Sequence, residues 1–341
     1  ELRTQNSELR TQNSELRTGS RLMDILKVSP TPDSAIGPCA VTLGNFDGVH
    51  LGHRELFRRL ISRSRQLSCQ SVVYTFDPHP LKFLQPEKAP LLLNTPAEKQ
   101  RLIAASHVDL LIEAPFTREL ASLSPEQFVD DILIAALQTK ALVIGYDYAF
   151  GRGRCGDAEF LRRYCSAKGI SVEVLQPVGA DGQPYSSTRI RQLVADGRVA
   201  DVVSRLGRHY NLEGEVVAGE QRGREIGFPT ANLLTEKEQL PAPGVYAIKV
   251  RHNLQEYSGV VNLGRCPTFG NGRSTIEVHL IDFSGQLYGQ RVRIYFVERL
   301  RDEQKFPNPQ ILSQAIAADV LRARQILGAR QIIQFQEYLS Y

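Results

Sequence analysis

The sequence predicts an α/β domain with a parallel sheet, followed by a smaller antiparallel β domain. Three observations support this fold class. Short apolar runs alternate with helical patterns from Cys39 to about residue 205, and beyond Leu206 short β-branched runs follow one another. A chain of 341 residues also has room for about two domains of roughly 100–200 residues each. We therefore expect residues 23–205 and residues 206–341 to form separate domains.

Five apolar runs of the first domain are predicted to be buried strands: Ala40–Leu43, Ser71–Phe76, Val108–Ile112, Ala141–Gly145 and Ser171–Leu175. Helix start signals lie between these runs. Thr95-Pro96-Ala97-Glu98 and Ser124-Pro125-Glu126-Gln127 each offer an N-cap hydroxyl, a proline at the first helical position and a capping-box residue. Strands separated by helices imply βαβ units and a parallel sheet, whose ligands bind beyond the carboxyl ends of the strands.

The second domain contains a further five predicted strands: Leu212–Ala218, Gly244–Val250, Tyr257–Leu263, Thr275–Phe283 and Gln290–Val297. Turn signals such as Asn271-Gly272 and Ser284-Gly285 separate them, and this spacing predicts an antiparallel barrel. The apolar residues of Pro309–Leu327 fall on one stripe, which predicts a closing helix. The segment Arg189–Leu206 is predicted to form two short helices that join the domains.

The composition argues against nucleic-acid and membrane partners. The net charge is only +4, and the basic residues are spread out, whereas nucleic-acid binding needs a concentrated basic face. No apolar run approaches the ~18–20 residues of a membrane span. The five cysteines are scattered and never paired as C-x-x-C, so neither a disulfide framework nor a zinc site fits them. We expect a cytoplasmic protein with reduced thiols.

The first 22 residues have a different character. Glu1–Ser7 recurs at residues 8–14 and begins again at Glu15, and Gly19-Ser20 precedes Met23, the single methionine of the sequence. We interpret residues 1–22 as an artificial, disordered leader and expect the natural protein to begin at Met23. A natural low-complexity extension is the alternative.

The first motif of chemical interest is residues 44–53, which read GNFDGVHLGH and directly follow a predicted strand. Glycines at such a turn let the backbone approach a phosphate, and the N-terminus of the next helix offers free N–H donors. His50 and His53 are three residues apart and are expected to project to one side, where they stabilise charge growing on an α-phosphate during in-line attack. The alternatives are an accidental match, with one histidine capping and the other packing, or a zinc site.

This motif matches the G-x-F-D-G-x-H-x-G-H signature of the nucleotidyltransferases that adenylylate small phosphates. Three further segments resemble the flavin branch of that superfamily, the bacterial bifunctional riboflavin kinase/FAD synthetases. These segments are Thr75–Pro80 (TFDPHP), Gly145–Gly151 (GYDYAFG) and Ser186–Arg191 (SSTRIR). The resemblance implies a Rossmann-like nucleotidyltransferase domain for residues 23–205.

The resemblance also implies roles for individual residues of this domain. Hydroxyls and an arginine at the start of a helix suit a triphosphate clamp, which the family uses in place of a lysine-rich loop. The implied ATP-binding residues are Gly44, Phe46, Asp47, His50, His53, Asp147, Ser187, Thr188 and Arg191. Asp77 and His79 are implied flavin contacts, although a proline-bounded turn of this kind often only ends a strand.

A second motif, residues 214–232, reads GEVVAGEQRGREIGFPTAN and resembles the riboflavin kinase signature almost without interruption. The alternative is an Arg/Gly-rich surface hairpin, which has no need of the sequence P-T-A-N. Thr230 and Asn232 offer a hydroxyl and an amide oxygen, hard ligands that suit the Mg²⁺ held by ATP phosphates. The residues that the resemblance assigns to MgATP are Gly219, Arg222, Gly227, Thr230 and Asn232.

In the family, a glutamate further along the barrel is the general base for the 5′-hydroxyl of riboflavin, and it corresponds to Glu277. Strand alternation is expected to place Glu277 and His279 on one face, opposite Ile276, Val278 and Leu280. A solvated outer-face carboxylate is the other interpretation of Glu277, but a hydroxyl nucleophile needs a base. Arg301 is a candidate flavin-phosphate contact, with a charged helix face as the competing view.

The resemblance thus implies a bifunctional enzyme with a C-terminal six-stranded, Greek-key riboflavin kinase barrel. The barrel would convert riboflavin and MgATP to FMN, and the first domain would convert FMN and ATP to FAD and pyrophosphate. A chain beginning near Leu206 is then expected to make FMN but not FAD. The protein is expected to be a monomer or a weak homo-oligomer. The rival functions are an adenylyltransferase for another phosphate ester and a non-enzymatic flavin sensor.

Overall fold

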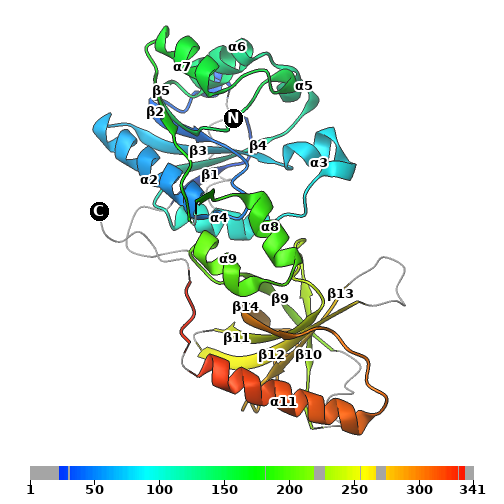
Figure 1. Ribbon diagram of the computed structural model, residues 1–341. Helices are drawn as coiled ribbons and strands as arrows, with labels where there is room; N and C mark the ends of the chain where they lie inside the picture. Colours follow the sequence, from blue (N-terminus) through cyan, green and yellow to red (C-terminus); the bar gives the residue numbers. More distant parts are fainter. Residues whose placement is uncertain are drawn as a thin grey trace.

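The computed structural model describes residues 23–29, 31–180, 182–218, 227–253, 255–265, 274–328 and 330–334. The predicted leader and two of the predicted ATP-binding residues, Gly219 and Arg222, lie outside these ranges. Within them, the chain forms an upper and a lower lobe with two short helices between them (Figure 1). The two predicted domains therefore correspond to two lobes.

The N-terminal lobe is built on a six-stranded parallel sheet with the strand order β1-β4-β3-β2-β5-β6. The strands are β1 (Asp24–Leu26), β2 (Cys39–Leu43), β3 (Gln70–Asp77), β4 (Leu110–Pro115), β5 (Thr139–Gly145) and β6 (Ser171–Leu175). All five predicted strands are confirmed. The prediction missed β1, because three residues are too few to show a periodic pattern.

Helices cover both faces of this sheet. One core cluster joins it to α2 (Leu51–Gln66) and α4 (Pro96–Ala104), and another joins it to η3 (Phe128–Ala136) and α7 (Ala158–Ser166). Successive residues of a strand pack into the two clusters in turn, one on each face of the sheet, which explains why these strands are apolar throughout. The remaining elements of the lobe are η1 (Pro32–Ser34), α3 (Pro80–Leu84), η2 (Pro86–Lys88), α5 (Arg118–Ser122), α6 (Pro125–Gln127), η4 (Arg152–Arg154), β7 (Gly179–Ala180) and β8 (Gln183–Pro184).

The two predicted helix starts differ in one respect. Ser124 and Gln127 form a complete capping box, with both reciprocal bonds present. The Thr95 hydroxyl likewise accepts from the N–H of Glu98, at 3.2 Å. The carboxylate of Glu98, however, pairs with Lys237 of the other lobe, so the prediction of a capping-box role for Glu98 is wrong. A buried cationic partner outcompetes the local backbone donor.

The C-terminal lobe is a closed antiparallel barrel with the strand order β10-β13-β12-β11-β14-β9. Its strands are β9 (Asn211–Val217), β10 (Ala231–Thr235), β11 (Gly244–His252), β12 (Gln255–Arg265), β13 (Ser274–Leu280) and β14 (Arg291–Arg301). The five predicted runs and the total of six strands are confirmed. The run that the pattern did not show is β10, the strand that continues from the P-T-A-N turn.

Helices close the barrel at two places. α8 (Ser187–Ala195) and α9 (Val199–Leu206) are the predicted joining helices, and their apolar residues share one core cluster with the barrel interior. α11 (Pro309–Leu327) has the predicted bounds and packs on β11, β12 and β14 through a smaller cluster that includes Ala323 and Leu327. Neither α8 nor α9 is therefore a free linker.

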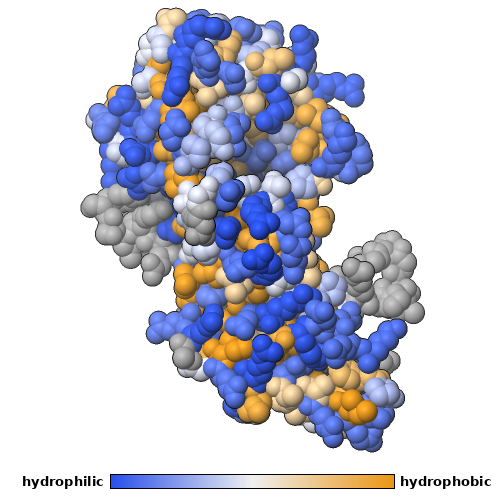
Figure 2. Space-filling model, viewed as in Figure 1, coloured by the Kyte–Doolittle hydropathy of each residue, from blue (hydrophilic) through white to orange (hydrophobic). Residues whose placement is uncertain are grey.

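The molecular surface is of mixed polarity. On the face shown in Figure 2, hydrophobic side chains are scattered among hydrophilic ones over both lobes. Within the described residues, no helix combines the length and the apolar character that crossing a membrane requires. The four cysteines described, Cys39, Cys69, Cys155 and Cys165, are free thiols.

Candidate active sites

The histidine motif forms the turn between β2 and α2. Phe46 and Val49 have positive φ angles of 50° and 38°, and Gly48 has a φ of 83°, so the chain folds back tightly before the helix. His50 is the N-cap of α2, and its Nδ1 accepts the backbone N–H of His53 at 3.3 Å. The two imidazoles are stacked, with ring centroids 3.6 Å apart and planes inclined by 18°. The prediction that both rings project to one side is confirmed.

His50 is buried and His53 is half-buried, and this determines their charge. Burial lowers the pKa of His50 to about 3, and the nearby positive charges of Arg208 and Arg191 add to the effect. The pKa of His53 is also held well below its usual value, first by burial and then by the charges of His50 and Arg208. Neutral imidazoles at physiological pH each carry one N–H, which suits donation to a phosphate oxygen.

Asp47, a predicted ATP-binding residue, is a buried anchor of the same turn. Its carboxylate accepts the backbone N–H groups of Leu93 and Asn94 at 2.9 and 3.3 Å and pairs with Arg191 at 2.6 Å. Its pKa is raised, because burial outweighs these favourable contacts. The Ser187 hydroxyl donates to the Asp47 carbonyl at 2.8 Å. The structure thus brings the start of α8 against the histidine turn.

The other predicted ATP-binding residues of this lobe occupy different positions around the turn. Thr188 accepts from Arg191 at 3.3 Å. The ring of Phe46 is buried and packs edge-on against His53, and a Cβ on Gly44 would meet that ring at 3.0 Å. Asp147 is exposed and follows β5, the neighbour of β2 in the sheet. Phe46 and Gly44 therefore shape the turn. Asp147 lies at the carboxyl ends of the parallel strands, the same edge of the sheet as the turn.

The predicted flavin contacts of the first lobe lie at the end of β3. Asp77 is the last residue of that strand, and His79 is the N-cap of α3. Nε2 of His79 lies 3.2 Å from the side-chain amide of Asn45, which connects it to the histidine turn. Burial lowers the pKa of His79 to about 4, and the charges of Arg191, Lys99 and Lys82 lower it further. Three cations therefore contribute to the field at this edge of the sheet, although Arg191 is paired with Asp47 and Lys82 with Glu238.

Sequence reasoning missed Lys99 in this field. Its ammonium group lies 3.4 Å from the Thr75 hydroxyl, at the carboxyl end of β3. Burial lowers the pKa of Lys99, although Glu113 and Asp77 partly offset this effect. In the sequence, Lys99 is marked only by its place one residue after the T-P-A-E helix start. That place does not show where its side chain points.

Two of the predicted kinase residues, Asn232 and Glu277, are neighbours on the outside of the barrel. Asn232 of β10 and Asn262 of β12 are the direct cross-strand neighbours of Glu277 on either side of β13. Directly opposed residues of an antiparallel ladder have Cβ atoms about 4.5–5.5 Å apart, so the three side chains form one polar row. Ile276 and Val278 are buried in the barrel core, which confirms the predicted alternation.

The P-T-A-N turn lies against the same strand. Nδ1 of His279 is 2.9 Å from the carbonyl oxygen of Pro229, and the Phe228 ring packs edge-on against the His279 ring. This contact places Thr230, between Pro229 and β10, beside the polar row. Gly227 adopts a φ of 86°, a conformation that favours glycine.

Arg301, the third predicted flavin contact, is the last residue of β14. Its guanidinium forms a two-pronged pair with Asp319 of α11, at 2.8–3.1 Å, and stacks on the Phe306 ring. The competing view of a charged helix face is wrong, because Arg301 belongs to a strand and joins it to a helix. A flavin contact of Arg301 stays a prediction.

Polar contacts connect the two lobes around the first site. Lys237 of the barrel lobe forms a buried ion pair with Glu98 at the start of α4 and lies over the Tyr210 ring. Lys82 of α3 pairs with Glu238, and Glu238 also accepts the backbone N–H of Leu92 at 3.0 Å. The histidine site is thus assembled at the junction of the lobes.

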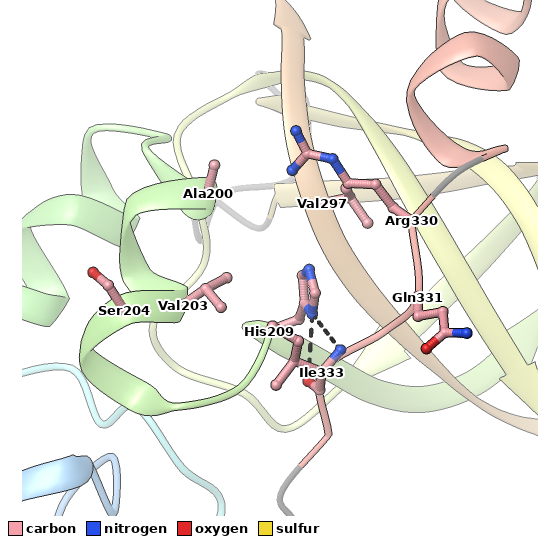
Figure 3. Close-up of a pocket in the computed structure, with 8 residues that line it drawn as sticks. All are labelled: Ala200, Val203, Ser204, His209, Val297, Arg330, Gln331 and Ile333. Atoms are coloured by element: carbon pink, nitrogen blue, oxygen red, sulfur yellow. Dashed lines mark hydrogen bonds between the residues drawn. The ribbon is translucent and has the colours of Figure 1, made fainter.

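A cavity of about 460 Å³ lies elsewhere, between α9, β14 and the segment 330–334 (Figure 3). His209 closes one side, because its ring and backbone bond to Ile333. None of its lining residues belongs to the predicted sites. They are Ala200, Val203, Ser204, His209, Val297, Arg330, Gln331 and Ile333.

Among the described residues, no three His, Cys, Asp or Glu side chains gather as a metal site, so the zinc alternative gains no support.

Comparison with known proteins identifies both lobes. The family model for FAD synthetase matches residues 33–189, and the family model for riboflavin kinase matches residues 206–327. The bifunctional riboflavin kinase/FMN adenylyltransferase of Pseudomonas fluorescens is 39% identical over 84% of this chain and 93% of its own. The protein of the same name from Escherichia coli K12 is 38% identical over 85% of this chain and 93% of its own.

A solved structure supports the architecture of the whole chain. A crystal structure from Streptococcus pneumoniae, described as a macrolide-efflux protein, has a TM-score of 0.80 and 32% identity and covers 89% of this chain and 99% of its own. Both lobes therefore recur together in a known fold. The matches to both family models and to full-length relatives show that this chain belongs to the family of bifunctional riboflavin kinase/FMN adenylyltransferases.

Proposed function

We propose that this chain, a riboflavin kinase and an FMN adenylyltransferase, makes FAD in two consecutive steps at the two residue groups described above. The barrel lobe phosphorylates riboflavin, and the N-terminal lobe then adenylylates the FMN that results. The observation that carries the assignment is the pairing of Glu277 with Asn232 across β13 and β10, together with the neutral, stacked pair of His50 and His53.

In the kinase step, Glu277 takes the proton from the 5′-hydroxyl of riboflavin. The oxygen attacks the γ-phosphorus of ATP, the bond to the β-phosphate oxygen breaks, and ADP leaves. The Thr230 hydroxyl and the Asn232 amide oxygen are hard ligands that fit the Mg²⁺ of MgATP, and Asn232 is the cross-strand neighbour of the proposed base. Gly219, Arg222 and Gly227 are proposed to bind the nucleotide phosphates.

In the adenylylation step, an oxygen of the FMN phosphate attacks the α-phosphorus of ATP, and pyrophosphate leaves. The phosphate is already ionised at neutral pH, so this step needs no base. The neutral imidazoles of His50 and His53 donate N–H bonds to the α-phosphate oxygens, where negative charge grows. Ser187, Thr188 and Arg191 at the start of α8 are proposed to bind the departing pyrophosphate.

The surroundings of the two sites support the choice of substrates. The three cations around His79, of which Arg191 and Lys82 are held in ion pairs, are proposed to attract the phosphates of FMN and ATP, and Asp77 is proposed to contact the flavin. A chain that used another phosphate ester would have no use for the kinase lobe. ATP as a substrate and the free thiols of the described cysteines support a cytoplasmic location.

The proposal is tested by incubating riboflavin with MgATP and separating the flavins by chromatography. Glu277→Ala is expected to abolish FMN formation from riboflavin and to leave FAD formation from added FMN intact. The double variant His50→Ala/His53→Ala is expected to show the reverse. Full FMN formation by Glu277→Ala, or full FAD formation by the histidine variant, would disprove the corresponding assignment.

A further inference from the structure

Arg208 joins the kinase half of the chain to the histidine turn. It lies between α9 and β9, within the region that matches riboflavin kinase. Its guanidinium is nevertheless turned toward the other lobe, where it donates to the carbonyl oxygens of Gly48 at 2.6 Å and Val49 at 3.0 Å. The residue is only 4% exposed, so these bonds are shielded from water. These two hydrogen bonds hold the backbone of the two residues that directly precede His50.

The turn at these two residues needs an external support. Val49 has a φ of 38°, which a β-branched side chain rarely adopts, and the preceding Gly48 has a φ of 83°. A Cβ on Gly48 would meet the Leu93 side chain at 2.8 Å. Such a turn persists only where its surroundings fix it, and bonds to two successive carbonyl groups fix the peptide planes that lead into His50.

Arg208 also acts on the histidines through its charge. Its positive charge contributes to lowering the pKa of both His50 and His53. Burial lowers the pKa of Arg208 itself to about 10, so the guanidinium stays charged at neutral pH, next to Glu98, Arg54 and Asp47. The other cation that lowers the pKa of His50 is Arg191 of α8. Arg208 thus bonds to the turn that leads into His50 and adds to the effect of burial, which is the larger cause of the low pKa of both histidines.

We propose that Arg208 is a positioning residue for adenylyl transfer, so that the kinase half of the chain completes the adenylyltransferase site. The guanidinium holds the carbonyl groups of Gly48 and Val49 and thereby sets the stacked, neutral pair of His50 and His53. This inference rests on the role proposed above for the two histidines. It goes further, because it makes FAD synthesis depend on a residue beyond the lobe that binds ATP for that step.

The test uses Arg208→Met and Arg208→Lys in the full-length chain. Arg208→Met is expected to lower kcat for FAD formation from FMN about 100-fold, the usual scale for disturbing a group that stabilises the transition state, with little change in the KM for FMN. The acid limb of the pH profile is expected to move to higher pH, because removing a cation raises the pKa of the histidines. Arg208→Lys keeps the charge and is expected to recover the pH profile but only part of kcat.

Two controls separate positioning from general destabilisation. FMN formation from riboflavin by the same variant reports on the fold of the barrel lobe and is expected to stay within about twofold. Arg205→Met is the matched variant, because Arg205 lies on α9 and donates to Asp201 and Ser204 of its own helix. It is expected to leave both activities unchanged.

Two results would overturn the inference. One is an Arg208→Met enzyme with normal FAD formation and an unshifted pH profile. The other is a parallel fall in both activities with a lower melting temperature, which would make Arg208 a general structural residue. A double-mutant cycle with His50→Ala separates the inference from its premise, since Arg208→Met should add little once His50 is gone. Normal FAD formation by the double histidine variant would refute the proposed function itself, whatever Arg208→Met does.

Discussion

Burial keeps His50 without a proton at neutral pH, and this affects stability as well as chemistry. The unfolded chain protonates this histidine near its ordinary pKa of about 6.5, whereas the folded protein resists protonation until about pH 3. The unfolded state therefore binds more protons between these values. It follows that the contribution of His50 to stability is complete above about pH 6.5 and is lost progressively as the pH falls toward 3.

We predict that His50→Asn reduces the acid sensitivity of the N-terminal lobe. Asparagine is a favourable N-cap and does not titrate, so the start of α2 stays capped. At about pH 5 the variant should avoid a loss of about 2 kcal/mol that the natural residue causes relative to pH 7. Urea unfolding at the two pH values measures this difference. His252→Asn, in the barrel lobe, is the control and should leave the acid sensitivity of the N-terminal lobe unaltered.

Individual residues also show which parts of the candidate sites a sequence pattern could predict and which it could not. The sequence could single out His50 and Glu277 as candidate site residues because each stands in a short, contiguous pattern. It did not reveal that the Asp47 carboxylate binds Arg191 and the backbone near Leu93, because those partners lie 144 and 46 positions away. Arg208 was missed for the same reason. Its partners are carbonyl oxygens, which any residue supplies, so no pattern of side chains marks them.

At the scale of elements, helices and strands of sufficient length were predictable. α11 was predicted with its correct bounds, because 19 residues with one apolar stripe and an initial proline leave little ambiguity. β1 has three residues and β10 five, and neither is long enough for an alternating pattern to stand out. Both acquire their structure from hydrogen bonding to neighbouring strands, which a local pattern does not contain.

The pairing of Arg301 with Asp319 makes a prediction about α11. The guanidinium of Arg301 donates three hydrogen bonds to the Asp319 carboxylate and one to the Asp302 carbonyl. The bonds to Asp319 join α11 to the end of β14. Arg301→Met and Asp319→Asn are each expected to destabilise the barrel lobe by about 1–3 kcal/mol, because each leaves a mostly buried polar partner unsatisfied. Melting temperatures measure the effect. Weaker binding of FMN that is confined to Arg301→Met would support the predicted flavin-phosphate contact as well, whereas normal stability in both variants would contradict the fastening role.

For the whole molecule, the order of the domains and the order of the reactions are opposite, and the structure adds a physical asymmetry between the two lobes. The N-terminal lobe receives two cations from the barrel side of the junction: Arg208, which bonds to the histidine turn, and Lys237, which pairs with Glu98 of α4. In the proposed barrel site, by contrast, the described polar row comes from β10, β12 and β13 of the barrel lobe itself. The sequence predicted two lobes but not this unequal dependence, because contacts across a junction involve residues that no local pattern brings together.

The asymmetry changes the prediction for an isolated kinase lobe. The sequence suggested a fragment beginning near Leu206, but that cut removes α8 and α9, whose apolar side chains belong to the core cluster of the barrel. Those side chains are Ile190, Leu193, Val194, Val199, Val202 and Leu206. Burying one such side chain is worth about 1.5–3 kcal/mol, so their loss is large compared with the stability of a small domain.

We therefore predict that a fragment beginning at Ser186 folds and forms FMN, whereas one beginning at Leu206 is poorly folded and binds hydrophobic dyes. Neither should form FAD from FMN, because both lack His50 and His53. Circular dichroism melts and flavin chromatography of the two fragments measure these outcomes. Equal stability of both fragments would mean that α8 and α9 contribute little to the barrel core. FMN formation by the longer fragment at the rate of the whole chain would show that the kinase site needs nothing from the N-terminal lobe, the opposite of the dependence proposed for the adenylyltransferase site through Arg208.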